Sequence, residues 1–217
     1  MSNLVAYYDD TPIDVKGGAE VQQSRRSEVP GVRAVGGLIR SKLVYVAVPM
    51  LGEVLMVPFG EYDEWSLRDR YNEALRIVSS LGAATITCET SGEFVVRRGL
   101  RARIGIHSGG LSQQKAQEDG FNYSHSGTGH EPRDPRPLRW PDEPGFAAAV
   151  SNVLEGGATE VTINISSTRT HSLDGALGTQ LKGLGFDLGG GSERSKATAL
   201  HIRATFPERS RGWRGRR

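Results

Sequence analysis

The clearest pattern in the chain is helical and lies between Asp63 and Leu81, where apolar residues recur every three or four positions. Side chains at that spacing share one face of an α-helix, so the segment predicts an amphipathic helix packed on a core. Ser66 followed by Asp69 fits a capping box, although Asp63 can also start the helix, and Gly82 suits a left-handed helix exit. The apolar residues of this face are Leu67, Tyr71, Ala74, Leu75, Val78 and Leu81.

Strands are predicted on both sides of this helix. Residues 43–48 and 54–57 are near-continuous apolar runs rich in β-branched residues, joined by residues 49–52, and they predict a buried hairpin. After the helix, residues 84–88 and 100–106 alternate apolar with polar side chains, which is typical of half-buried strands. This part of the chain is therefore predicted to run ββαββ.

A second set of elements follows Pro144. Residues 145–154 carry a helical apolar stripe, and residues 161–166 alternate as a strand does. Residues 173–184 predict a further helix, and residues 200–206 a closing strand with Leu, Ile, Ala and Phe on one face. The fold class is therefore expected to be α+β, a mixed β-sheet covered by amphipathic helices in the approximate order ββαββ-loop-αβαβ.

Differences in composition along the chain predict five segments. Residues 1–31 lack a period of either 2 or 3.6 and are expected to form a disordered N-terminal arm. Residues 32–110 form the ββαββ half and residues 145–206 the αβαβ half. Between them, residues 111–144 are rich in Pro and Gly; a structureless loop of that length is uncommon inside a compact unit, so it is a linker or a functional loop. Residues 207–217 form an Arg-rich tail.

Composition indicates how the protein is stabilised and where it is expected to be located, but it does not indicate a function. With 217 residues, of which 37% are hydrophobic, the chain can bury a core without disulfides or metal, while part of its length is expected to stay unpacked. Cys88 is the single cysteine, so no disulfide within the chain and no cysteine-based zinc cluster is possible. The first residues do not resemble a signal peptide, and no apolar run approaches the ~20 residues of a membrane span. A cytoplasmic location is expected.

Positive charge is concentrated in two places, although the net charge is only +2. One cluster lies at the predicted strand of residues 100–106 and just before it, and the other in the tail, where a tryptophan stands among arginines. Charge and an aromatic ring together suit single-stranded nucleic acid or an anionic membrane surface. The expected polyanion-binding residues are Arg97, Arg98, Arg101, Arg103, Arg209, Arg211, Trp213, Arg214, Arg216 and Arg217.

One short segment is similar to an enzyme family. The sequence Arg103-Ile104-Gly105-Ile106-His107-Ser108-Gly109 resembles a strand of the class III nucleotidyl cyclases. That resemblance implies cyclisation of ATP or GTP by two metal ions on a pair of carboxylates, in a dimeric site. The family places one carboxylate in an early strand, but the predicted strands at residues 43–48 and 54–57 contain no acid. Because a motif needs its structural context, the segment is interpreted as a strand that ends in a glycine turn.

Other candidate chemistry is incomplete. Residues 189–192 read Gly-Gly-Gly-Ser, but they follow a helix and lack the Gly-Lys-Ser/Thr ending of a phosphate-binding loop. His125 and His130 match no zinc spacing, and Cys88 alternates with Ile86, which points its thiol into the core. No catalytic residue, cofactor or metal site is predicted, and an enzyme is the less favoured class.

These observations favour a non-enzymatic binding or assembly module that joins a homo-oligomer or a larger protein complex. A nucleic-acid-binding protein that uses the Arg-rich tail and the face of Arg101 and Arg103 is the main alternative. An enzyme with an unrecognised site stays open, and so does an effector that acts on membranes, which the Thr, Ser and Asn alternation of residues 159–168 motivates.

Overall fold

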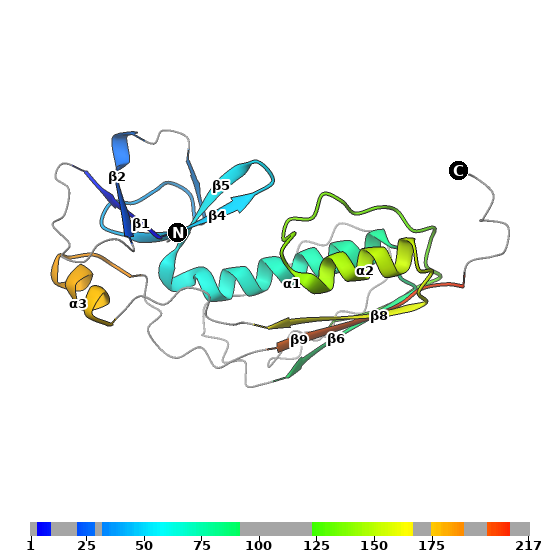
Figure 1. Cartoon of the computed structure of the whole chain (residues 1–217). Coiled ribbons are helices and arrows are strands. Elements are labelled where there is room, and N and C mark those ends of the chain that lie inside the picture. The colour runs from blue at the N-terminus through cyan, green and yellow to red at the C-terminus, as the bar shows by residue number, and fades with distance from the viewer. Residues whose placement is uncertain are drawn as a thin grey trace. The chain divides into compact units, whose positions relative to one another are not determined.

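The computed structural model of the chain describes residues 4–9, 21–28, 32–91, 123–166, 175–188 and 199–208. These residues divide into two compact units: unit 1 comprises Met1–Asp69 and Thr168–Ser195, and unit 2 comprises Arg70–Ser167 and Lys196–Arg217. Each unit contains helix and sheet (Figure 1), so the predicted α+β class is confirmed. None of the described helices is long and apolar enough to cross a membrane.

Unit 1 is built on a five-stranded mixed sheet with the strand order β2-β1-β4-β5-β3. The pairs β1–β4 and β4–β5 are antiparallel, whereas β1–β2 and β3–β5 are parallel. Its strands are β1 (Leu4–Tyr8), β2 (Val21–Arg25), β3 (Arg33–Ala34), β4 (Val44–Met50) and β5 (Glu53–Pro58), with short 3-10 turns at Arg26–Glu28 and Phe59–Glu61.

The β4–β5 hairpin closes through a two-residue turn. Met50 lies opposite Glu53, so Leu51 and Gly52 form the turn, with φ values of 43° and 92°. Positive φ at both central residues is the geometry that matches the twist of the flanking strands. The hairpin predicted from residues 43–57 is therefore present, with its turn at the predicted place.

Strands β1 and β2 lie in the segment that was expected to be a disordered arm, and here the structure differs from the expectation. Leu4, Val5, Ala6 and Tyr7 are all buried, because β1 is an inner strand between β2 and β4. The ring of Tyr7 meets that of Tyr45 edge to face, 5.7 Å between centroids, within one apolar cluster. A run of five apolar residues is too short to show a period, so its burial depends on partners elsewhere in the chain.

Helix α3 (Gly175–Gly183) completes the described part of unit 1. The chain that leaves it returns to the start of β4: the Asp187 amide donates to the Lys42 carbonyl at 2.8 Å, and the Lys42 amide donates to the Tyr7 carbonyl at 2.8 Å. Backbone bonds therefore tie residues after α3 to the same sheet that β1 joins.

Unit 2 is a two-layer arrangement of helices on an antiparallel sheet, with the strand order β7-β6-β9-β8. Helix α1 (Tyr62–Ser80), which crosses the division at Asp69, and helix α2 (Pro144–Leu154) lie over the same face of this sheet (Figure 1). The sheet combines strands from both predicted halves of the chain. Its strands are β6 (Thr85–Ser91), β7 (Tyr123–Ser126), β8 (Glu160–Ser166) and β9 (Ala199–Thr205).

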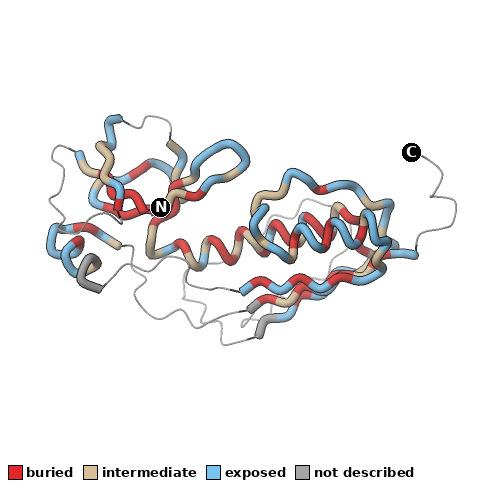
Figure 2. Tube along the Cα trace, in the orientation of Figure 1, coloured by how far each residue is buried: buried red, intermediate tan, exposed pale blue. Residues whose placement is uncertain are grey.

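Burial alternates along these strands, as Figure 2 shows for β8 and β9. On β8, Val161, Ile163 and Ile165 are buried while their neighbours are exposed. The apolar side chains face the helices, where Phe146 of α2 is 0% exposed. The alternation predicted for residues 161–166 is confirmed, and it leaves the other face of the sheet polar.

Residues 127–143, here called the strap, connect β7 to α2 inside unit 2. The strap is held to the end of α1 by backbone bonds: Arg133 donates to the Ser80 carbonyl at 2.8 Å, and His130 to the Gly82 carbonyl at 3.3 Å. Gly82 has φ +84°, and a Cβ there would lie 2.0 Å from the His130 carbonyl oxygen, so only glycine fits this crossing. This part of the predicted 111–144 loop is packed on unit 2; residues 111–122 lie outside the described residues.

Candidate interaction surface

The residues expected to bind polyanions all lie outside the described part of the chain. These are Arg97, Arg98, Arg101, Arg103, Arg209, Arg211, Trp213, Arg214, Arg216 and Arg217. The segment similar to nucleotidyl cyclases and the glycines of residues 189–191 lie outside it too. The polyanion site therefore stays a prediction, and unit 2 supplies the candidate surface among the described residues.

The face of the unit 2 sheet that points away from α1 and α2 is polar on every strand. We call it the open face. Cross-strand partners share a face, so the pairing register places its residues in rows across the sheet. Those rows are Ser126–Thr85–Thr205–Glu160, Ser124–Thr87–Arg203–Thr162 and Glu89–His201–Asn164.

Side chains on the open face pair with one another across strands. Arg203 donates from Nε and Nη2 to the two carboxylate oxygens of Glu160, at 2.6 and 3.0 Å. This bidentate bond lowers the pKa of the Glu160 carboxyl. Nδ1 of His201 lies 2.7 Å from Oδ1 of Asn164, which accepts when that nitrogen carries the proton. Pairing in this way leaves the open face nearly neutral, with hydroxyl groups as its main feature.

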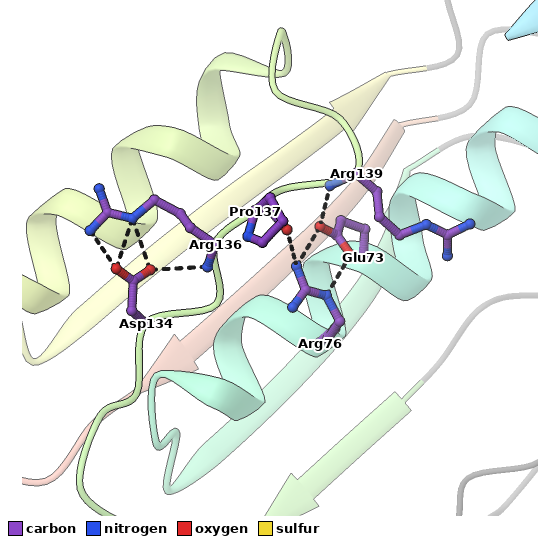
Figure 3. A network of polar contacts seen from close by, with 6 residues as sticks. All are labelled: Glu73, Arg76, Asp134, Arg136, Pro137 and Arg139. Atoms are coloured by element: carbon purple, nitrogen blue, oxygen red, sulfur yellow. Dashed lines mark hydrogen bonds and ion pairs between the residues drawn. The ribbon is translucent and has the colours of Figure 1, made fainter. Parts of the chain in front are cut away.

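The helix side of unit 2 contains a buried carboxylate. Glu73 on α1 is 1% exposed, and both of its oxygens are bonded to Arg76, each at 2.7 Å. The Arg139 amide of the strap donates to the same carboxylate at 2.9 Å. Arg76 also donates to the Pro137 carbonyl, at 3.4 Å. Figure 3 shows these bonds fastening the strap along α1.

The protonation of Glu73 follows from these contacts. Burial by itself raises the pKa of a carboxyl, but the hydrogen bonds from Arg76 and from the Arg139 amide outweigh burial, so the pKa of Glu73 is lowered. Nearby in the strap, Arg136 binds Asp134 through its side chain, and its Nη2 lies 2.6 Å from Oδ2 (Figure 3). Asp134 is exposed, so only the Glu73 pair combines charge with deep burial among these contacts.

Arg70 joins three elements of unit 2. Its guanidinium carbon lies 5.4 Å from the centroid of the Trp140 ring, a cation–π arrangement. Its Nη1 lies 3.4 Å from Oε2 of Glu143, just before α2, and donates to the Ser166 carbonyl of β8 at 3.4 Å. Helix α1, the end of the strap and the last residue of β8 therefore share one cation.

The single cysteine is a core residue. Cys88 is 4% exposed and hydrogen-bonds to Tyr71 of α1; burial raises the pKa of its thiol to about 11. Burial also raises the pKa of Tyr71 and of Tyr123 on β7. A thiol with this pKa is protonated at neutral pH, so Cys88 is not poised as a nucleophile. Its burial is the one predicted from its alternation with Ile86.

Among the described residues, His125 and His130 are not grouped with further metal-ligand side chains. His125 is exposed on β7, and Nδ1 of His130 lies 2.7 Å from the Glu131 carbonyl oxygen. Among the described residues, no group of three or more His, Cys, Asp or Glu side chains is arranged to hold a metal ion.

The chain has no match among family models, curated proteins or solved structures. The geometry of unit 2 supplies a covered apolar face, an open polar face and two sheet edges, a combination suited to recognition through backbone and hydroxyl groups.

Proposed function

We propose that this protein is a non-enzymatic binding or assembly module that associates with protein through the sheet of unit 2. The observation that carries the proposal is strand β8, which is seven residues long and is the last strand of the sheet order among the residues that the structure describes. A strand in that position presents a row of backbone N–H and C=O groups on its second side, and such a row is a template for another strand.

The charged side chains of unit 2 support this proposal. The carboxylate of Glu73 is occupied by Arg76 and the strap, and that of Glu160 by Arg203. Both pairs join elements of the fold, and the cysteine thiol is buried beneath α1. Burial or a structural partner accounts for each perturbed pKa value among the described side chains of unit 2.

The proposal is tested by native size fractionation of extracts from the cells that normally produce the chain. Its elution should correspond to more than the mass of one chain, and the peptide containing β8 should exchange its amide hydrogens more slowly in that complex than in the isolated protein. An extract in which the protein migrates only as a monomer would contradict an assembly role.

A second candidate function is binding of single-stranded nucleic acid. The observation that favours it is the tail of residues 207–217, where five arginines and Trp213 occur with a single acid, Glu208. Phe206, just before the tail, is 8% exposed, so the tail follows directly on the core of unit 2. Oligonucleotide binding by a chain that lacks residues 209–217 tests this candidate.

A further inference from the structure

Strand β8 differs from the other edge strands of the described sheets. β2 has five residues, β3 two and β7 four, whereas β8 has seven. All seven pair in unbroken register with β9, from Glu160 opposite Thr205 to Ser166 opposite Ala199. β8 is thus the longest edge strand in the part of the chain that the structure describes.

The sequence of β8 lacks the features by which proteins block an exposed edge. Lysines, prolines and bulges usually serve that purpose. β8 reads Glu-Val-Thr-Ile-Asn-Ile-Ser, with no proline, no lysine and no glycine. Its one charge, Glu160, stands at the end of the strand and is already bonded to Arg203 of the same sheet. At the other end of the strand the Ser166 carbonyl accepts a hydrogen bond from Arg70 at 3.4 Å, so the edge available to a further strand lies between these two ends.

The same sequence is symmetric about its centre. If two copies of β8 pair antiparallel around Ile163, Thr162 lies opposite Asn164 of the second copy, Val161 opposite Ile165, and Glu160 opposite Ser166. Apolar residues then meet apolar ones on the helix side, and polar residues meet polar ones on the open face. The two copies of Glu160 lie six positions apart, about 20 Å at the rise of a strand, beyond the range of strong repulsion in salt.

Helix α2 is compatible with close approach at this seam. It packs on β8, and its exposed residues are uncharged and mostly small: Pro144, Ala147, Ala148, Ser151 and Asn152. The helix contains no charged residue between Pro144 and Leu154. A helix that is apolar or small on its exposed side can lie beside a symmetry-related helix without burying an unpaired charge.

We infer that a second copy of this chain pairs with β8, antiparallel and centred on Ile163, so that the two four-stranded sheets form one continuous sheet of eight strands. This inference rests on the proposed function, because it names the partner of the binding module as the chain itself. The open faces of the two copies form one polar surface, and the two α2 helices lie on the opposite side of it.

Paired charges test the register directly. In Thr162→Glu/Asn164→Glu, each new carboxylate faces another across the two-fold axis, whereas in Thr162→Glu/Asn164→Lys each carboxylate faces an ammonium. Both positions are exposed, and in the monomer Thr162 lies opposite Arg203, which tolerates an acid. The dimer dissociation constant of the Glu/Glu variant should be about thirtyfold higher than that of the Glu/Lys variant, because the first has two repulsive pairs and the second two attractive pairs. Sedimentation velocity over a range of concentrations measures these constants, and Thr87→Glu, exposed on the inner strand β6, should behave as the wild type.

Cysteine cross-linking gives a second measurement. Thr162→Cys/Asn164→Cys should form a covalent dimer on mild oxidation, because each new thiol faces the other type across the axis. Thr162→Cys alone should not, since its two copies are diagonal neighbours about 7–8 Å apart. Cys88 is buried and stays out of the reaction. A chain that is monomeric at all concentrations, or charge variants that dimerise equally, would overturn the pairing. Native extracts test the binding function separately, since a complex with another protein there would uphold that function while the pairing fails.

Discussion

The two faces of the unit 2 sheet are formed by the same strands but have different roles. On the helix side the side chains are mostly buried: Ile86, Ile163 and Phe146 are at most 2% exposed, and the buried carboxylate of Glu73 has three hydrogen bonds. On the open face, the Glu160–Arg203 pair has equally short bonds but stands in solvent. Burial, and not bond length, therefore separates contacts that stabilise the fold from contacts that leave a surface available.

The largest effect is expected from truncating a side chain on the helix face and comparing it with its neighbour on the open face. Ile86→Ala should lower the free energy of unfolding by about 2 to 5 kcal/mol, because it leaves a cavity in the core. Thr87→Ala, one position along β6, should change it by about 0.5 kcal/mol or less. Both values come from urea unfolding followed by circular dichroism. Equal losses at the two positions would show that the open face is covered.

The next effect separates the two arginine–glutamate pairs. Arg76→Ala removes two hydrogen bonds from a buried carboxylate that keeps only the Arg139 amide, and it should cost about 2 to 3 kcal/mol. Arg203→Ala removes a bond of the same geometry in solvent, and the unfolding midpoint should hardly move. The measurement is the urea midpoint of each variant at the same protein concentration. If Arg203→Ala costs as much as Arg76→Ala, burial does not decide the strength of these pairs.

The same contrast shows what the sequence can predict. The alternation of β8 and the helical spacing of α1 are local patterns, so their elements and buried faces follow from neighbouring residues. Glu73 was not predicted as a core residue, because its burial depends on Arg139 in the strap, 66 positions away in the chain. Leu75, predicted on the apolar face, is only half-buried, whereas Ile77 is 0% exposed.

The candidate surface could not be predicted from the sequence either. That residues 161–166 form a strand could be predicted, but the place of this strand at the edge follows from pairing between β8 and β9, whose nearest ends are 33 positions apart in the chain. Strand β1 was missed for a related reason, since four of its five residues are buried and the strand lies between β2 and β4. The arginine clusters were chosen by composition, which gives residue types without positions, and they stay a prediction.

The pH dependence of stability should report the buried carboxylate. The pKa of Glu73 is lower in the folded protein than its usual value of 4.5. The stability that the ionised carboxylate contributes to the fold is therefore fully present above about pH 4.5. As the pH falls, the unfolded chain takes up the proton first, and the contribution is lost on passing through the lowered folded pKa. Glu73→Gln should therefore be less stable than the wild type at neutral pH, and the difference should shrink below about pH 4.5. Urea unfolding of both proteins between about pH 7 and pH 3 measures it. A difference in stability that stays constant over this pH range would show that the titrating group is not Glu73.

The smallest effect on the fold is expected from removing residues 209–217, which follow the described end of unit 2. The free energy of unfolding should stay within about 0.5 kcal/mol, because the core of the unit ends with Phe206. Binding of a single-stranded oligonucleotide, measured by fluorescence anisotropy, should instead weaken steeply if the tail arginines neutralise phosphates. Each lost phosphate contact lowers the slope of log affinity against log salt by about 0.7, so loss of three contacts lowers it by about 2.

Trp213→Ala isolates stacking: a cost of about 1 to 3 kcal/mol in oligonucleotide binding is expected if a base lies on the indole, and almost none if the tail acts only through charge. Since neither change touches β8, self-association measured by sedimentation should be the same for the full-length and the truncated chain. If deletion abolished the dimer instead, the tail and not the sheet edge would be the assembly surface; if the full-length chain bound no oligonucleotide even at low salt, the nucleic-acid candidate would be excluded.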